Sequence, residues 1–127
     1  MNLKSQLAQT PGVLEDRLID FAVNACRLLP QTAGSRVGDH IGGQLLRSAT
    51  SSAANYAAVR GAESRRDFIH KMQVCLKELR ESHLWLRILD RLEFEPAASI
   101  TPLLREANEL VSIFVKSIVT AKKNSAL

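Results

Sequence analysis

The feature that most constrains the fold is the spacing of nonpolar residues, which recur at alternating intervals of four and three along four segments. This spacing places them on one face of an α-helix, which has 3.6 residues per turn. With their capping residues, the predicted helices cover residues 13–29, 35–60, 64–92 and 101–121. Four amphipathic helices joined by short loops predict an all-α protein with the up-down-up-down, antiparallel architecture of a four-helix bundle.

Individual residues predict where these helices begin and end. Ser35 and Ser64 precede the second and third helices and can accept hydrogen bonds as N-caps. Pro30 is expected to end the first helix, and Gly61 the second. Pro102 is expected at the first helical position of the last helix.

The length of 127 residues predicts one domain. We expect a flexible lead-in over 1–12, the bundle domain over 13–122 and a frayed tail over 123–127. No nonpolar run reaches the ~18 residues that a membrane span needs, and the first residues do not resemble a secretory signal. The expected location is therefore the cytoplasm, where Cys26 and Cys75 would be free thiols at nonpolar helical positions.

The second predicted helix carries small and polar residues on the face that should be buried, namely Ser48, Ser52 and Asn55. It also contains Gly42 and Gly43, each of which costs ~1 kcal/mol relative to Ala within a helix. Close packing against a neighbouring helix would offset that cost. A buried Asn55 would then need a hydrogen-bond partner, because an unpaired buried amide costs ~1–3 kcal/mol.

The third predicted helix carries a line of cations on the side opposite its nonpolar face, about 160° away at 100° per residue. We call five of its residues the basic stripe: Arg66, Lys77, Arg80, Arg87 and Arg91. One interpretation is a phosphate-binding surface for RNA or DNA. The other is an ordinary solvated face whose cations pair with acidic residues on its flank, namely Asp67, Glu78 and Glu81.

The end of the same helix is nonpolar almost all the way round. We call four of its residues the interface patch: Leu84, Trp85, Ile88 and Leu92. A helix of this kind must be covered by more than its own bundle, so the patch is predicted to contact another subunit. Alternatively, the lead-in or the last loop covers it.

The sequence contains no recognisable catalytic or cofactor-binding motif. His40, His70 and His83 lack partners at the spacing of a metal site, and no Gly-rich phosphate loop is present. We therefore expect no enzymatic activity, no cofactor and no metal.

Several runs resemble a known family. The first is Gln44-Leu45-x-Arg47-Ser48-Ala49-x-Ser51-Ser52-x-x-Asn55, the second is Glu63-Ser64-x-x-Asp67-Phe68-Ile69-His70-Lys71, and Leu76-Lys77-Glu78 and Trp85-Leu86 follow. Together they resemble the four-helix bundle proteins encoded in 23S ribosomal RNA intervening sequences, over about residues 13–122. Family members often carry Glu and Gly soon after the Asn, whereas this chain has Ala58 and Arg60-Gly61.

The resemblance implies a left-handed bundle that assembles into a homopentamer and has a poorly defined role. Some relatives lie within ribosomal RNA insertions, and related accessory proteins of retroelements bind a reverse transcriptase and nucleic acid. No catalytic residue comes with the family.

Two functions are compatible with these features. The first is a non-enzymatic homo-oligomer that binds nucleic acid, preferably RNA, through basic helix faces, consistent with a net charge of +4. The alternative is a protein-interaction scaffold whose partner is another protein, for example a reverse transcriptase.

Overall fold

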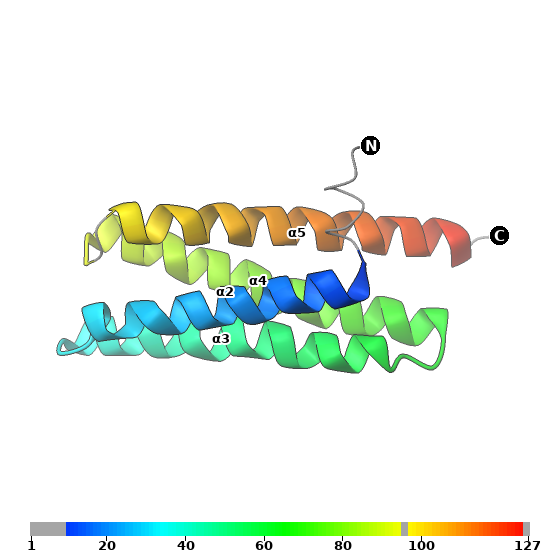
Figure 1. The fold of residues 1–127 in the computed structure, drawn as a ribbon, viewed down its shortest axis with the longest axis horizontal. Coiled ribbons are helices and arrows are strands. Elements are labelled where there is room, and N and C mark those ends of the chain that lie inside the picture. Colours follow the sequence, from blue (N-terminus) through cyan, green and yellow to red (C-terminus); the bar gives the residue numbers. More distant parts are fainter. Residues whose placement is uncertain (1–9, 95–96, 126–127) are drawn as a thin grey trace.

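The structure is a computed structural model that describes residues 10–94 and 97–125. It contains the helices α2 (Pro11–Thr32), α3 (Arg36–Arg60), α4 (Arg65–Leu92) and α5 (Ala97–Ser125). Figure 1 shows them running alternately in opposite directions along one long axis. The predicted all-α four-helix bundle is confirmed, while its hand stays a prediction.

Each helix packs mainly against its neighbour in the sequence. α3 contacts both α2 and α4, and α5 contacts α4, whereas the contact between α2 and α5 is much less extensive. The bundle is therefore more open between its first and last described helices than at its other three edges.

The core is built from the nonpolar faces predicted by the spacing. In α2, the spacing of four and three predicts a buried face, and all of its members are buried, namely Leu14, Leu18, Phe21, Ala25 and Leu28. In α5 the spacing predicts a buried face that includes Ala107, Phe114 and Ile118, and these three are buried. The same spacing predicts Leu104 and Val111 on this face, but Leu103 and Leu110 are buried in their place. Leu104 and Val111 are half-buried beside the core.

The N-caps were predicted correctly. Ser35 Oγ accepts a hydrogen bond from the backbone N–H of Gly38 at 2.9 Å, and Ser64 Oγ accepts one from that of Asp67 at 3.0 Å. These bonds satisfy N–H groups that a helix start leaves without partners. Gly61 is the C-cap of α3, as expected.

The two proline predictions were wrong. Pro30 lies inside α2, which continues to Thr32, because the Thr32 hydroxyl and the Ala33 N–H both donate to the Leu29 carbonyl and close the last turn. Pro102 lies inside α5, which begins at Ala97, and burial of Ile100 stabilises the extra first turn.

The ends of the chain also differ from the expected boundaries. α2 begins at Pro11, inside the expected lead-in over 1–12. Proline suits a first helical position, because it has no N–H to leave unpaired there. α5 continues to Ser125, through part of the segment 123–127 expected to fray. Residues 1–9 and 126–127 of these segments lie outside the described residues.

The expected close packing of α3 holds for one of the two predicted glycines. A Cβ at Gly42 would lie 2.7 Å from Thr32 Oγ1 and 3.2 Å from Leu29 Cδ2, whereas one at Gly43 would meet nothing within 4 Å. Gly38, which the prediction missed, is the tightest position, since a Cβ there would overlap the Thr32 carbonyl oxygen. The crossing of α2 and α3 therefore depends on Gly38 and Gly42.

Candidate nucleic-acid interface

Helix α4 carries the candidate interface, and its sequence explains why it is long and well defined. Ser64 caps its start, and the Asp67 carboxylate accepts a hydrogen bond at 3.2 Å from the N–H of Glu63, the residue before the cap. One face of the helix is buried in the core through Met72, Cys75, Leu79, Ser82, Leu86 and Leu89. The opposite face is therefore left to solvent along the whole helix.

All five residues of the basic stripe are exposed. His70, Gln73 and Leu84, which share the same line, are exposed as well. From Arg66 to Arg91 the stripe extends roughly 37 Å at 1.5 Å per residue. That length is close to one helical turn of a nucleic-acid duplex, about 34–36 Å.

Three of the acidic residues beside the stripe, Asp67, Glu78 and Glu81, are paired with other cations. Asp67 forms an ion pair with Lys71 at 2.8 Å, and this hydrogen bond lowers the pKa of Asp67. Arg47 of α3 reaches across to Glu78 at 3.2 Å and also pairs with Glu81. The hydrogen bond that Arg47 donates to Glu81 is the main cause of the raised pKa of Arg47.

The cations of the stripe are consequently left without acidic partners. Within 10–94 and 97–125, none of the five forms an ion pair. This is not the arrangement expected of an ordinary solvated face, in which the flanking acids would neutralise the stripe. Near its middle, burial and the charge of Arg87 lower the pKa of His83, so that His83 is neutral at pH 7.

A shallow groove of about 560 Å³ runs beside the stripe, between α4 and α5. Lys77 and Arg80 line one wall, and Lys122 of α5 lines the other. Sequence analysis missed Lys122, because the nonpolar pattern of α5 does not show which part of α4 its last turns contact.

The interface patch divides into two kinds of residue. Leu84 and Leu92 are each 45% exposed, while Trp85 and Ile88 are half-buried against the core. The Trp85 Nε1–H is buried and has no hydrogen-bond partner among the described residues. The bundle itself thus covers part of the patch and leaves its two leucines to solvent.

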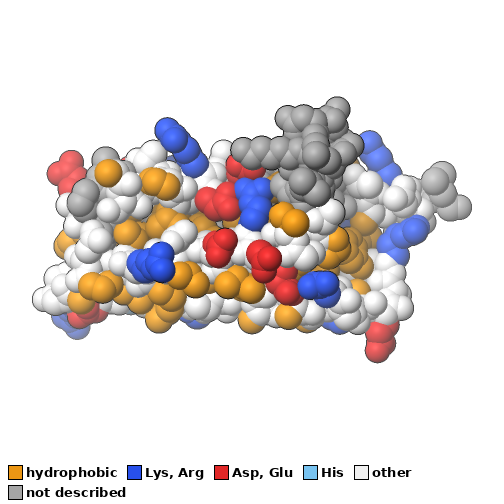
Figure 2. All heavy atoms as spheres, in the orientation of Figure 1, with side chains coloured by type: hydrophobic (Ala, Val, Ile, Leu, Met, Phe, Trp, Pro, Cys, Tyr) orange, Lys and Arg blue, Asp and Glu red, His pale blue; other side chains and the backbone are white. Residues whose placement is uncertain are grey.

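A second nonpolar surface was not predicted. Ile19 and Val23 of α2 are 46% and 42% exposed, and together with Ala53 they border a groove of about 420 Å³ between α2 and α3. Figure 2 shows hydrophobic side chains along this side of the molecule. The signal was present in the sequence, because Ile19 and Val23 are spaced by four residues outside the core-facing set of α2.

The small polar residues of α3 have structural partners. The hydroxyls of Ser48 and Ser82 lie 2.8 Å apart in the core, and the Ser52 hydroxyl donates to the Ala49 carbonyl at 2.7 Å. The Asn55 amide donates to the Ser51 carbonyl of its own helix at 2.8 Å, so the partner expected for Asn55 is local. These contacts account for the residues by packing and hydrogen bonding alone.

The described residues contain neither a metal-binding cluster nor a helix that could span a membrane. No group of three or more His, Cys, Asp or Glu side chains there is arranged to hold a metal ion. None of the helices in this part of the chain has the length and nonpolar character needed to cross a membrane.

Comparisons with known proteins agree with this architecture. The family model described as 23S rRNA-intervening sequence protein matches residues 16–116. A crystal structure of a protein of unknown function from the S23 ribosomal protein family of Bacteroides thetaiotaomicron is 30% identical, with a TM-score of 0.77. The match covers 85% of this chain and 96% of that one. No curated protein matches the chain.

Proposed function

The chain belongs to the 23S rRNA-intervening sequence protein family, and from that premise we propose that it is a non-enzymatic, cytoplasmic protein that binds nucleic acid through the basic stripe of α4. RNA is the preferred ligand in this proposal. The protein acts as a homo-oligomer, so that the stripe is repeated by symmetry.

The observation that carries the proposal is the unpaired state of the stripe. A cation that is already paired must break its ion pair before it contacts a phosphate. The nearby carboxylates of Asp67, Glu78 and Glu81 are held by Lys71 and Arg47, which leaves the stripe available. Contacts of this kind release counterions from the nucleic acid and supply most of the affinity of sequence-independent binding.

Assembly would strengthen weak single contacts. Each chain has a net charge of +4, so five copies, the number implied by the family resemblance, would carry about +20. Linked binding sites can raise the overall affinity by ~10²–10⁴ without any new contact. The interface patch is the surface that we assign to this assembly, because Leu84 and Leu92 remain exposed in the single bundle.

The test is a charge-reversal variant of the stripe with a matched control. Lys77→Glu, Arg80→Glu and Arg87→Glu, combined in one protein, should abolish binding to a labelled RNA hairpin. The control combines Arg27→Glu, Arg36→Glu and Arg105→Glu, three exposed cations on the other helices, and changes the net charge by the same amount. Equal losses of affinity in the two proteins would reject the stripe as the binding surface.

The alternative function, a scaffold for a protein partner, is favoured by one observation. The groove bordered by Ile19, Val23 and Ala53 is a nonpolar surface that the bundle leaves uncovered. A protein that binds a partner there, for example a reverse transcriptase, would lose the interaction on Val23→Glu and keep it in the stripe variant. The opposite result would support the nucleic-acid function.

A further inference from the structure

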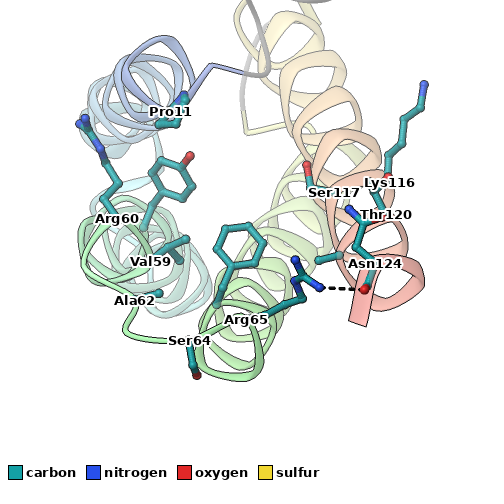
Figure 3. A pocket seen from close by; sticks show the side chains of 13 residues that line it. Pro11, Val59, Arg60, Ala62, Ser64, Arg65, Lys116, Ser117, Thr120 and Asn124 are labelled. Carbon is teal, nitrogen blue, oxygen red and sulfur yellow. Dashed lines mark hydrogen bonds between the residues drawn. The ribbon is translucent and has the colours of Figure 1, made fainter. Parts of the chain in front are cut away.

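One end of the bundle contains a cavity of about 1080 Å³, which we call the end cavity. It lies where α2 and α4 begin and where α3 and α5 end (Figure 3). Among the contacts between the described helices, the one between α2 and α5 is the least extensive. The residues used below line it: Tyr56, Arg65, Phe68, Ser117 and Thr120.

Tyr56 contributes a hydroxyl group to the end cavity. The residue is only 4% exposed, and its ring packs edge-on against Phe114, with ring centres 5.7 Å apart. Its hydroxyl makes no hydrogen bond with any described residue and is accessible from the cavity, so it is free to bond to a molecule bound there. Burial raises the pKa of Tyr56, so the hydroxyl stays protonated and can donate.

Further polar groups face the same space. Figure 3 shows Ser117 directed from α5 toward the cavity. Neither the Ser117 nor the Thr120 hydroxyl has a hydrogen-bond partner among the described residues, whereas Ser112 on the same helix donates to the Asn108 carbonyl at 3.1 Å. The cavity therefore presents hydroxyl groups from α3 and from α5.

The charge of the cavity comes from Arg65. Its guanidinium donates to the Asn124 carbonyl at 2.7 Å, which holds it at the mouth between α4 and α5 (Figure 3). Arg60 is paired with Glu15 at 3.1 Å, and the Lys116 side chain extends away from the cavity in Figure 3. No acidic residue is among the described residues that line the cavity, and the half-buried Phe68 adds an aromatic ring to its wall.

We infer that the end cavity binds one nucleotide. The base packs against Phe68, its polar edge bonds to the hydroxyls of Tyr56 and Ser117, and Arg65 contacts the phosphate. Proteins recognise unpaired nucleotides by this combination of aromatic contact, edge hydrogen bonds and a cation.

The nucleotide can be a free mononucleotide or an unpaired nucleotide at the end of a strand. The second source rests on the proposed function. It is supported by the position of Arg65, which directly precedes Arg66, the first residue of the basic stripe. A strand that follows the stripe along α4 therefore reaches the mouth of the cavity.

The first measurement uses adenosine monophosphate, with inorganic phosphate as the comparison, and follows NMR shifts of residues that line the cavity. The second compares a blunt RNA hairpin with the same hairpin carrying a short single-stranded overhang. The overhang should tighten binding by about fivefold or more, the lower limit for one stacked base. Shifts with the mononucleotide alone identify a free nucleotide, and a preference for the overhang identifies a strand end.

Tyr56→Phe and Ser117→Ala should each remove the response to the nucleotide, whether it is the NMR shifts or the preference for the overhang. Each substitution deletes one hydroxyl and little else. Ser112→Ala on the same helix should leave it unchanged. The inference is overturned if neither probe responds, if phosphate reproduces the mononucleotide shifts, or if neither hydroxyl variant changes them. Failure of the blunt hairpin to bind contradicts the proposed binding of RNA by the basic stripe, not the nucleotide site in the end cavity. The two proposals can therefore fail independently.

Discussion

At the scale of single residues, the contact between α3 and α4 depends on a buried pair of hydroxyls. Ser48 and Ser82 are both fully buried and lie 2.8 Å apart, and the Ser82 hydroxyl also donates to the Glu78 carbonyl at 3.0 Å. Two small side chains thus let the helices approach closely while each polar group keeps a partner.

Ser48→Ala should lower the free energy of unfolding by about 1 kcal/mol, the usual net value of one hydrogen bond. Ser48→Val should cost about 1–3 kcal/mol more, because the added methyl groups have no free volume in this contact. Urea unfolding of the three proteins measures both differences. A valine variant as stable as the alanine variant would show that the helices are not closely packed at this point.

Cys75 predicts a loss of stability at alkaline pH. Burial is the main cause that raises the pKa of its thiol to about 12, from an ordinary value of 9.0. Because the folded protein holds this thiol protonated, the stabilisation is fully present below the pKa of the unfolded chain, about 9. It is lost as the pH rises from about 9 to about 12, since the thiol then ionises more readily in the unfolded chain. Urea unfolding across this interval should show a steeper decline for the wild type than for Cys75→Ala. Parallel declines would contradict this assignment.

At the scale of the helices, two glycines of α3 offer a matched comparison. Gly38→Ala should destabilise strongly, because its Cβ would overlap the Thr32 carbonyl of α2. Gly43→Ala should instead stabilise by up to about 1 kcal/mol, because a Cβ there meets nothing and alanine favours the helix. Thermal unfolding separates the two. A stable Gly38→Ala variant would mean that the helices can separate at little cost.

Helix type and core-facing residues were predictable because they follow from local periodicity. The serine caps were predictable for the same reason, since Ser35 and Ser64 bond within their own first turns. The end of α2 near Pro30 and the start of α5 near Pro102 were not predictable. Hydrogen bonds to the Leu29 carbonyl extend α2, and burial of Ile100 stabilises the first turn of α5. Gly38 was missed because its constraint comes from a backbone atom of another helix.

At the scale of the whole molecule, the position of the basic stripe was predictable, but the absence of ion pairs between its cations and other described residues was not. A spacing of four and three fixes which residues lie opposite the core. The pairing of Glu78 and Glu81 with Arg47 depends on the packing of α3 against α4, which one segment of sequence cannot reveal. The end cavity is likewise formed by four helices together.

Assembly is tested at the exposed leucines of the interface patch. Leu92→Glu should convert the oligomer to a monomer without lowering the thermal midpoint of the bundle, because Leu92 is 45% exposed in the single chain. Light scattering measures the mass. The control is Val13→Glu, which alters a residue 39% exposed at the opposite end of the bundle (Figure 1). An assembly that survives Leu92→Glu, or a wild type that is already monomeric, would contradict the assignment.

The central claim, that the basic stripe contacts phosphates, is tested most directly by the salt dependence of RNA-hairpin binding. The logarithm of the binding constant falls with the logarithm of salt concentration, with a slope of about −0.9 per phosphate contact. Lys77→Gln, Arg80→Gln and Arg87→Gln together should reduce the slope by about 2–3. Neutralising Arg27, Arg36 and Arg105 in the same way should leave it unchanged. Equal slopes in the wild type and the stripe variant would contradict the account.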